Sequence, residues 1–264
     1  MDATYTLHRG TAPLLVSVPH CATALPGEVR DALGPRAHAV EDADWHLDRL
    51  YDFVRARGAS FLVPRYARYA IDLNRPPDDT PMYPGASNTG LCPVTFFDGT
   101  PLYADARAPD AAAIATRRER WWQPYHDALA AELDAIRARH GHAVLFDGHS
   151  IRSRIPWLFE GKLPDFNLGT ASGASCAPSL RDAAVQALTT PEFTLAVDGR
   201  FKGGYITRRY GRPAERIHAI QLEMCQSTYM DETPPFAYDE ARAARLLPHL
   251  RRLVDALLAW TPDR

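Results

Sequence analysis

Short apolar runs and amphipathic segments alternate along most of this chain, and the alternation limits the folds open to it. Pro13–Pro19 and Ala143–Phe146 are apolar runs of strand length, whereas apolar side chains recur at helical spacing from Ile114 to Ile136. The same criteria predict strands at residues 61–63, 70–73, 193–197 and 217–224, and helices at 44–57, 180–188 and 240–260. Strands that alternate with helices are typical of an α/β domain around a largely parallel sheet. Because no linker divides the chain, we expect residues 1–264 to form a single domain.

Charge and cysteine content exclude several classes of function. The 30 Lys and Arg residues nearly balance the 32 Asp and Glu residues, so the net charge of -2 offers no basic surface for nucleic acid or anionic lipid. No apolar run approaches the ~18 residues of a membrane span, and the N-terminus does not resemble a secretory signal. The cysteines are far apart and form no Cys-x-x-Cys pair: Cys21, Cys92, Cys176 and Cys225. We therefore expect a reduced, cytoplasmic protein that binds neither nucleic acid nor membranes.

Polar residues appear where several predicted strands end. His20 follows the first strand, Asn74 and Arg75 follow the strand at 70–73, and Asp147 and His149 follow the strand at 143–146. In open α/β sheets, ligands bind beside the carboxyl ends of the strands. These side chains therefore mark a candidate binding or catalytic site.

His20 and His149 are candidate zinc ligands, because neutral imidazole suits zinc. A catalytic zinc typically has three protein ligands and an open position for water, and Asp44 is placed to supply a carboxylate. Asp42 and His46 are alternatives for this third position. Asp44 is equally well explained as an acid at a helix N-terminus, where the helix dipole stabilises it.

Glu223 lies within the predicted strand at 217–224. Apolar residues alternate there with Gln221 and Glu223, so one strand face is apolar and the other presents a carboxylate beside an amide. A sheet face covered by helices rarely tolerates an unpaired carboxylate. Either this is an edge strand with a solvated face, or Glu223 is a general base that takes a proton from metal-activated water.

Basic residues supply candidate anion sites. The guanidinium of Arg75 matches a carboxylate in a bidentate manner, although a surface ion pair would explain it as well. A second basic group lies around Gly203 and Gly204 and is either a solvated face or a second anion site; it contains Lys202, Arg208 and Arg209. Asp147, close to His149 in sequence, either orients an imidazole or bonds the backbone of a turn.

Other catalytic schemes lack their motifs. The sequence has no Gly-x-x-x-x-Gly-Lys phosphate loop, no Gly-x-Gly-x-x-Gly fingerprint and no His-Glu-x-x-His, and the segment around Ser150 lacks the second glycine of a nucleophile elbow. Between Pro76 and Pro109 the chain is rich in Pro, Gly, Asn and Asp, and a loop of this length is commonly functional. We expect this loop to cover the site as a lid.

A set of short motifs runs in order from about residue 13 to residue 230. The motifs are Ser17-Val18-Pro19-His20, Asp42-Ala43-Asp44-Trp45-His46, Asp72-Leu73-Asn74-Arg75-Pro76, Asp147 to Ser153, Leu163 to Thr170, Gly199 to Gly204 and Gln221-Leu222-Glu223. The ordered set resembles the N-formylglutamate deformylase (N-formylglutamate amidohydrolase) family. The resemblance implies a three-layer α/β sandwich with a mixed, largely parallel sheet, like that of the zinc carboxypeptidases and aspartoacylases. It also implies hydrolysis of N-formyl-L-glutamate to L-glutamate and formate, a late step of one route of histidine degradation.

The resemblance further implies roles for the candidate residues. The metal ligands would be His20, Asp44 and His149, with Zn2+ as the default ion and another divalent ion such as Co2+ as the alternative. Glu223 would be the general base, and Arg68 would stabilise the oxyanion. Asn74 and Arg75 would bind one carboxylate of a substrate that has two, and the second would be bound by Arg154, Lys202 or Arg208.

Two positions depart from the pattern of the relatives. Their acidic ligand comes three residues after the first His, where this chain has Thr23, so the carboxylate must come from Asp44 or Asp42. Arg68 stands one residue closer to the Asn-Arg pair than its counterpart in the aspartoacylases. Two other functions stay open: the same metal chemistry on another N-acyl amino acid or a C-terminal peptide bond, and non-catalytic binding of acidic metabolites.

Overall fold

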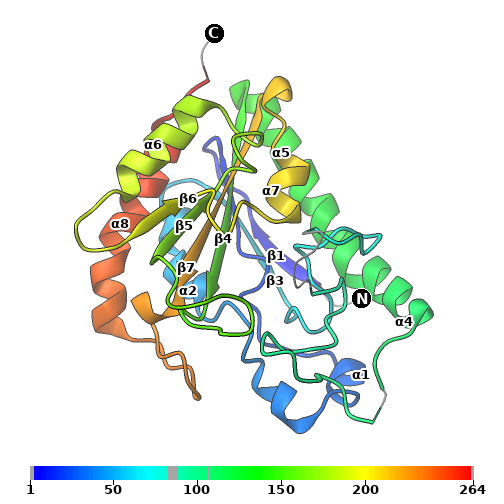
Figure 1. Ribbon diagram of the computed structural model, residues 1–264. Helices are drawn as coiled ribbons and strands as arrows, with labels where there is room; N and C mark the ends of the chain where they lie inside the picture. The colour runs from blue at the N-terminus through cyan, green and yellow to red at the C-terminus, as the bar shows by residue number, and fades with distance from the viewer. Residues whose placement is uncertain (1–2, 83–88, 106, 263–264) are drawn as a thin grey trace.

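The computed structural model describes residues 3–82, 89–105 and 107–262. Its centre is a seven-stranded sheet with the strand order β1-β3-β2-β4-β7-β5-β6 (Figure 1). The strands are β1 (Tyr5–His8), β2 (Leu14–Ser17), β3 (Ser60–Pro64), β4 (Ala143–Ile151), β5 (Phe166–Gly169), β6 (Leu195–Val197) and β7 (Ile217–Cys225).

The sheet is mixed but largely parallel. β3, β2, β4 and β7 pair in parallel, and β6 is parallel to β5. β1 is antiparallel to β3, and β5 is antiparallel to β7. The prediction of an α/β fold around a mixed, largely parallel sheet is confirmed. The carboxyl ends of β2, β4 and β7 therefore lie at the same edge of the sheet.

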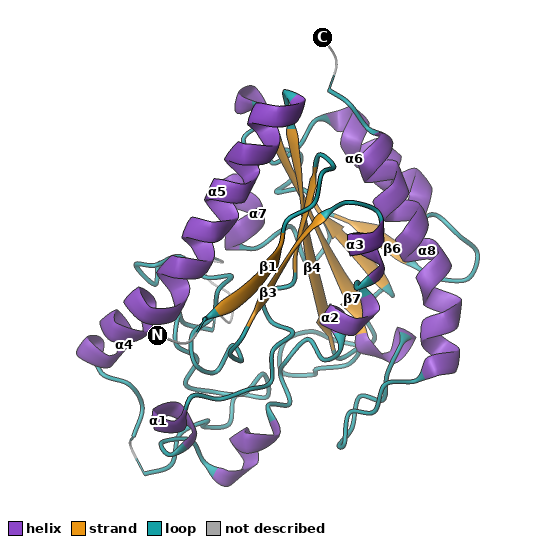
Figure 2. Cartoon of the chain, turned by 180° about the vertical axis from the view of Figure 1, so that it is seen from behind, coloured by secondary structure: helices purple, strands orange, loops and turns teal. Residues whose placement is uncertain are grey.

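Helices cover both faces of the sheet (Figure 2). Buried residues of α2 (Leu47–Leu50), α3 (Phe53–Ala56), α6 (Pro178–Leu188) and α8 (Glu240–Ala259) belong to the core on one face. On the other face the core includes residues of α1 (Gly27–Arg30), α5 (Gln123–His140) and α7 (Tyr205–Tyr210), and α4 (Ala111–Arg117) packs against it. A π-helical turn, Arg118–Trp122, joins α4 to α5, and short 3-10 turns lie at Pro35–Ala39, Pro213–Glu215 and Gln226–Thr228.

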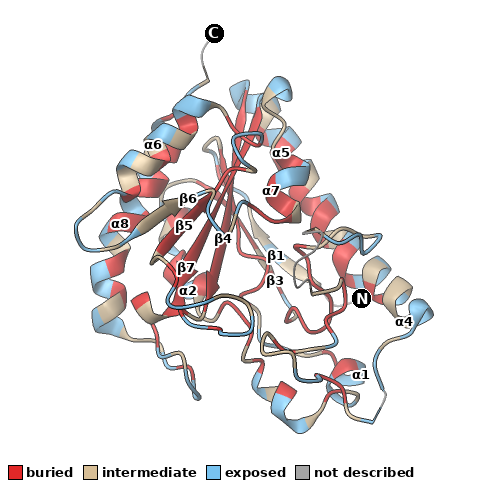
Figure 3. Ribbon diagram, viewed as in Figure 1, coloured by how far each residue is buried: buried red, intermediate tan, exposed pale blue. Residues whose placement is uncertain are grey.

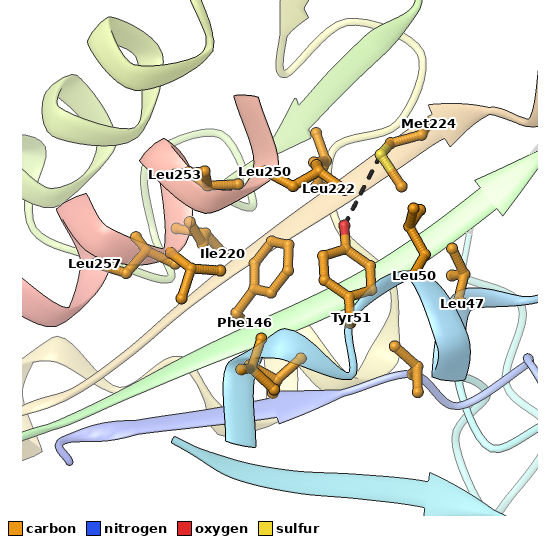
Figure 4. Packing of buried hydrophobic residues seen from close by; sticks show 14 of the residues in the cluster. Leu47, Leu50, Tyr51, Phe146, Ile220, Leu222, Met224, Leu250, Leu253 and Leu257 are labelled. Atoms are coloured by element: carbon orange, nitrogen blue, oxygen red, sulfur yellow. Dashed lines mark hydrogen bonds between the residues drawn. The ribbon is translucent and has the colours of Figure 1, made fainter. Parts of the chain in front are cut away.

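The two cores follow from the alternation of side chains along buried strands. Phe146, Ile220 and Leu222 pack with α8, whose Leu250, Leu253 and Leu257 complete one layer (Figure 4). The Tyr51 hydroxyl lies 3.8 Å from the Met224 sulfur within this core. Leu145 and Ala219 point to the opposite face, toward α5. Complete burial of one such side chain stabilises the fold by about 1.5–3 kcal/mol, and β4 and β7 are buried along their whole length (Figure 3).

Several sequence predictions differ from the structure. Residues 70–73 are irregular rather than a strand: the Asp72 N–H donates to the Leu91 carbonyl, and the Asp72 side chain accepts from the Asn74 N–H. The helix expected over 44–57 is two short helices, α2 and α3. β1, β5 and α7 were not predicted. In the part of the chain that the structure describes, no helix is long and apolar enough to cross a membrane.

Candidate active site

His20, Asp44 and His149 meet at the carboxyl ends of β2 and β4. His149 is in β4, His20 follows β2, and the Asp44 N–H donates to the His20 carbonyl at 3.0 Å. One ligand atom from each of the three side chains lies within 4.8 Å of the others. All three residues are buried, with exposed fractions of 4%, 2% and 2%. Two imidazoles and a carboxylate in this arrangement could hold a divalent metal ion.

The Nδ1 atoms of both imidazoles face the Asp44 carboxylate. Asp44 Oδ2 is 3.2 Å from His149 Nδ1 and 3.8 Å from His20 Nδ1. On the far side of each ring, Nε2 meets another carboxylate: Asp72 Oδ1 lies 2.7 Å from His20, and Asp147 Oδ2 lies 3.1 Å from His149. When Nε2–H donates to these carboxylates, the Nδ1 lone pairs are left for the shared space, as in metal-binding histidines.

Asp72 and Asp147 are themselves held in place. The Asp72 carboxylate accepts from Arg68 Nη2 at 2.6 Å and from the Asn74 N–H at 2.8 Å. Burial opposes its charge, but Arg68 and His20 hold the pKa of Asp72 well below its usual range. Asp147 contacts His149 Nε2, which agrees with a role in orienting the imidazole rather than in bonding the backbone of a turn. Asp72 was given no role from the sequence, although an acidic residue two positions before Asn74 could have indicated one.

The charges around the cluster favour a positive charge at its centre. Burial opposes protonation of His149, but the carboxylates of Asp147 and Asp44 outweigh it and raise the pKa of His149 well above its usual value. Burial and the neighbouring Arg68 lower the pKa of His20. The carboxylates therefore concentrate negative potential at the space between the two Nδ1 atoms, where a cation would be stabilised.

Glu223 lies beside this cluster on an interior strand. β7 pairs with β4 on one side and β5 on the other, which places Glu223 opposite His149 and Asn167. The alternative of a solvated edge strand is therefore wrong. Glu223 is 8% exposed, and burial raises its pKa to about 8. Burial thus makes this carboxylate more basic than an exposed one, a property that favours a role as general base.

A cavity of about 260 Å³ adjoins the cluster. Its lining includes the three cluster residues, Glu223, Gln221 and the side chains of Arg68, Asn74 and Arg75. Arg68 is buried, lies over the Phe97 ring at 4.8 Å and places Nη1 3.4 Å from His20 Nδ1. Its guanidinium therefore borders the space that a metal ion and a reacting carbonyl would share.

Asn74 connects the cluster to α7. Its Nδ2 lies 3.1 Å from His149 Nε2, and its Oδ1 accepts from the Ile206 N–H at 2.8 Å. Gly204 packs so closely that a Cβ there would lie 2.2 Å from Asn74 Nδ2, which only a glycine avoids. With His149 Nε2–H donating to Asp147, the Asn74 amide packs beside the ring without accepting its proton, and α7 fixes this amide at the cavity.

Arg75 is oriented by the polypeptide that follows it. Its Nε donates to the Thr89 carbonyl at 2.8 Å and its Nη2 to the Thr89 hydroxyl at 2.9 Å. Both Thr89 and Phe97 line the cavity, so part of the Pro76–Pro109 loop borders the site. Residues 83–88 and 106 of that loop lie outside the described residues, and a lid role stays a prediction.

The remaining candidates lie elsewhere. Arg154, Lys202 and Arg208 are exposed and are not among the residues that line the cavity, whereas Arg200 is. The two alternatives for the third metal ligand, Asp42 and His46, are also engaged away from the cluster. Asp42 accepts from Tyr69, Phe97 and Arg152, and His46 Nε2 lies 2.7 Å from the Phe236 carbonyl.

Comparison with known proteins agrees with this geometry. The family model for N-formylglutamate amidohydrolase matches residues 12–230. The chain belongs to the N-formylglutamate amidohydrolase family. It is 50% identical to an N-formylglutamate deformylase of Pseudomonas putida over 266 aligned positions, which cover 100% of this chain and 99% of the relative. A deformylase of the same name from Pseudomonas aeruginosa is 49% identical over 100% of this chain and 99% of its own length.

Two solved structures share the fold. The crystal structure of N-formylglutamate amidohydrolase from Ralstonia eutropha JMP134 matches with a TM-score of 0.82 and 28% identity, covering 97% of each chain. Gene product Atu2144 from Agrobacterium tumefaciens matches with a TM-score of 0.73 at 17% identity, covering 98% of this chain and 96% of the other. The latter similarity concerns the fold alone.

Proposed function

We propose that this protein hydrolyses N-formyl-L-glutamate to L-glutamate and formate with the help of a divalent metal ion, Zn2+ by default. The observation that carries the proposal is the buried cluster of His20, Asp44 and His149 beside Glu223. Family membership and the full-length similarity to proteins named N-formylglutamate deformylase support the choice of substrate.

The donor set fits a catalytic zinc site. Two imidazole nitrogens and one carboxylate are three ligands of the type that zinc takes when it keeps a position open for water. Each imidazole has a carboxylate behind it, Asp72 or Asp147, which fixes its ring and its tautomer. When bound, such an ion would activate water and polarise the formyl carbonyl.

The surrounding residues would supply the rest of the chemistry. Glu223 takes a proton from the attacking water and then gives that proton to the departing amide nitrogen. Its raised pKa, caused by burial, suits both transfers. Arg68 stabilises the negative charge that develops on the formyl oxygen. Burial of these groups removes bulk water, which strengthens each of their electrostatic contacts.

Substrate recognition must rest on the glutamate part, because a formyl group offers little surface. Arg75 lines the cavity and forms no ion pair with a described carboxylate, so its charge is available to the α-carboxylate of the substrate. Asn74 lies next to it in the sequence and also lines the cavity, with its Nδ2 3.1 Å from His149 Nε2. A neutral N-formyl amino acid would leave a cationic group of the site without its partner.

A substrate panel tests the proposal. Purified protein with added Zn2+ should release formate from N-formyl-L-glutamate at least ~100-fold more efficiently than from N-formyl-L-methionine, since a site built for a polar group strongly rejects analogues that lack it. Release of L-glutamate from N-acetyl-L-glutamate, measured alongside, would show whether the site also selects the acyl group. Release from N-formyl-L-methionine at a comparable kcat/KM, or from neither formyl compound, would contradict the proposal.

A further inference from the structure

Arg200 is a cavity residue to which the preceding argument gives no role. It lines the same cavity as Glu223 and Arg75, and it follows β6 by three residues. Arg75 belongs to the segment after β3, and β3 and β6 lie on opposite sides of β4 and β7 in the sheet. The two arginines therefore come from opposite flanks of the cluster.

Neither arginine has an ion-pair partner in the part of the chain that the structure describes. Arg68 forms an ion pair with Asp72, but neither Arg75 nor Arg200 forms one with any carboxylate in residues 3–82, 89–105 and 107–262. The Arg200 guanidinium lies 5.4 Å from the Phe159 ring centre and 6.0 Å from that of Phe201. Contacts of this kind orient a guanidinium without cancelling its charge. The cavity thus has two positive groups that remain to be balanced by a ligand.

The two arginines differ in depth. Arg75 is partly buried and fixed by Thr89, whereas Arg200 is exposed at the cavity rim. In an N-formyl amino acid with an acidic side chain, the side-chain carboxylate of glutamate lies two bonds further from the formyl carbon than the α-carboxylate. With the formyl group beside the proposed metal ligands, the α-carboxylate would lie near the more buried Arg75. The side-chain carboxylate, which is farther away, would lie near the exposed Arg200.

We propose that Arg200 binds the side-chain carboxylate of the substrate while Arg75 binds its α-carboxylate. The inference rests on the proposed function and assigns the second anion site to a residue other than Lys202, Arg208 or Arg154. Apolar residues that line the cavity would contact the intervening methylene groups; they are Phe97, Ile151, Leu158 and Phe201. Arg200 is thus a specificity-determining residue, because it selects the acidic side chain.

The test pairs Arg200→Gln with two substrates, N-formyl-L-glutamate and N-formyl-L-glutamine. Loss of one charged hydrogen-bonding contact should lower kcat/KM for N-formyl-L-glutamate by about 10- to 100-fold, chiefly through KM. The same variant should change kcat/KM for N-formyl-L-glutamine less than about threefold, because that substrate lacks the charge Arg200 recognises. Arg75→Gln should instead lower both values, since both substrates carry the α-carboxylate.

Controls separate a local effect from a general one. Arg181→Gln removes an exposed arginine of α6, on the other side of the sheet, and should leave both substrates unaffected. Metal content of Arg200→Gln should equal that of the wild type. If the wild type is active but Arg200→Gln keeps full activity, this inference alone is overturned. The same holds if Arg200→Gln loses activity equally on both substrates. A wild-type protein that releases no formate from either substrate overturns the proposed function, and this inference with it.

Discussion

His20 Nε2 lies 2.7 Å from Asp72 Oδ1, and this contact directs His20 Nδ1 toward Asp44. Asp72 is fully buried and is held in turn by Arg68 and by the Asn74 backbone. The carboxylate therefore sets the orientation and tautomer of one proposed ligand while it neutralises the arginine next to it. Loss of this one group should disturb both metal binding and the electrostatics of the cavity.

Asp72→Asn should weaken metal binding by about 10- to 100-fold, the usual cost of removing a carboxylate behind a histidine ligand. The amide can still accept the His20 N–H, but it no longer raises the basicity of the ring or balances Arg68. Competition with a chromophoric chelator would measure the dissociation constant. Asp165→Asn, a change at an acid that pairs with Lys162 near the surface, is the matched control. An unchanged constant in Asp72→Asn would show that His20 does not depend on this contact.

Glu223→Gln should retain the metal and lose turnover. The amide has nearly the same shape, so the cluster stays intact, but it cannot accept a proton from water. Removal of a general base typically lowers kcat by ~10²–10⁴-fold. Formate release and metal content, measured on the same preparation, check both parts. Near-native turnover in this variant would exclude Glu223 as the base.

Gly204→Ala should damage the site through packing. A Cβ at this position would lie 2.2 Å from Asn74 Nδ2, so Asn74 must move from its place beside His149 and in the cavity wall. We expect a loss of about 1–3 kcal/mol in the free energy of unfolding, as for other overpacked sites, together with reduced kcat/KM. Gly27→Ala is the control, because a Cβ there meets nothing within 4 Å. Equal stability and activity of the two variants would refute this account of Gly204.

His126 should make the protein acid-sensitive. Burial lowers its pKa to about 3; the ring stacks on Trp122 and Nε2 lies 2.9 Å from the Leu73 carbonyl. The fold therefore favours the neutral ring. The stability that this preference contributes is fully present above the pKa of histidine in the unfolded chain, about 6.5. It is lost as the pH falls from about 6.5 toward 3, at up to about 1.4 kcal/mol per pH unit.

Urea unfolding at pH 7, 5.5 and 4.5 would measure this effect. The free energy of unfolding of the wild type should fall more steeply than that of His126→Gln, whatever the stability of the variant at pH 7. The dependence of the free energy of unfolding on pH is the informative quantity. Loss of a packing contact alone lowers this free energy by the same amount at every pH. Parallel curves for the two proteins would contradict the assignment.

The sequence predicted the parts of the fold and site that depend on periodic patterns. The apolar runs near Val16, Phe146 and Ile220 correspond to β2, β4 and β7, and the polar residues at their ends converge because parallel strands end at one edge. His20, His149 and Glu223 could be located this way. The strand ends alone locate these three residues, whatever the conformation of the loops between the strands.

Residues in aperiodic segments could not be placed in this way. Asp72 was predicted to lie in a strand, whereas its N–H donates to the distant Leu91 carbonyl and its side chain accepts from the Asn74 N–H. Between β6 and α7 the sequence offers several basic residues, and tertiary packing turns Arg200 to the cavity while Lys202 is exposed outside it. Local propensity says nothing about such side-chain directions, because distant segments decide them.

Formate release as a function of bound metal tests the central claim most directly. Chelator-treated protein should be inactive on N-formyl-L-glutamate, and titration with Zn2+ should restore turnover in proportion to bound metal, with an end point near one ion per chain. His149→Ala, which removes one proposed ligand, should neither bind the ion tightly nor regain activity. Full turnover by metal-free protein, or a full complement of tightly bound zinc in His149→Ala, would contradict a catalytic metal held by His20, Asp44 and His149.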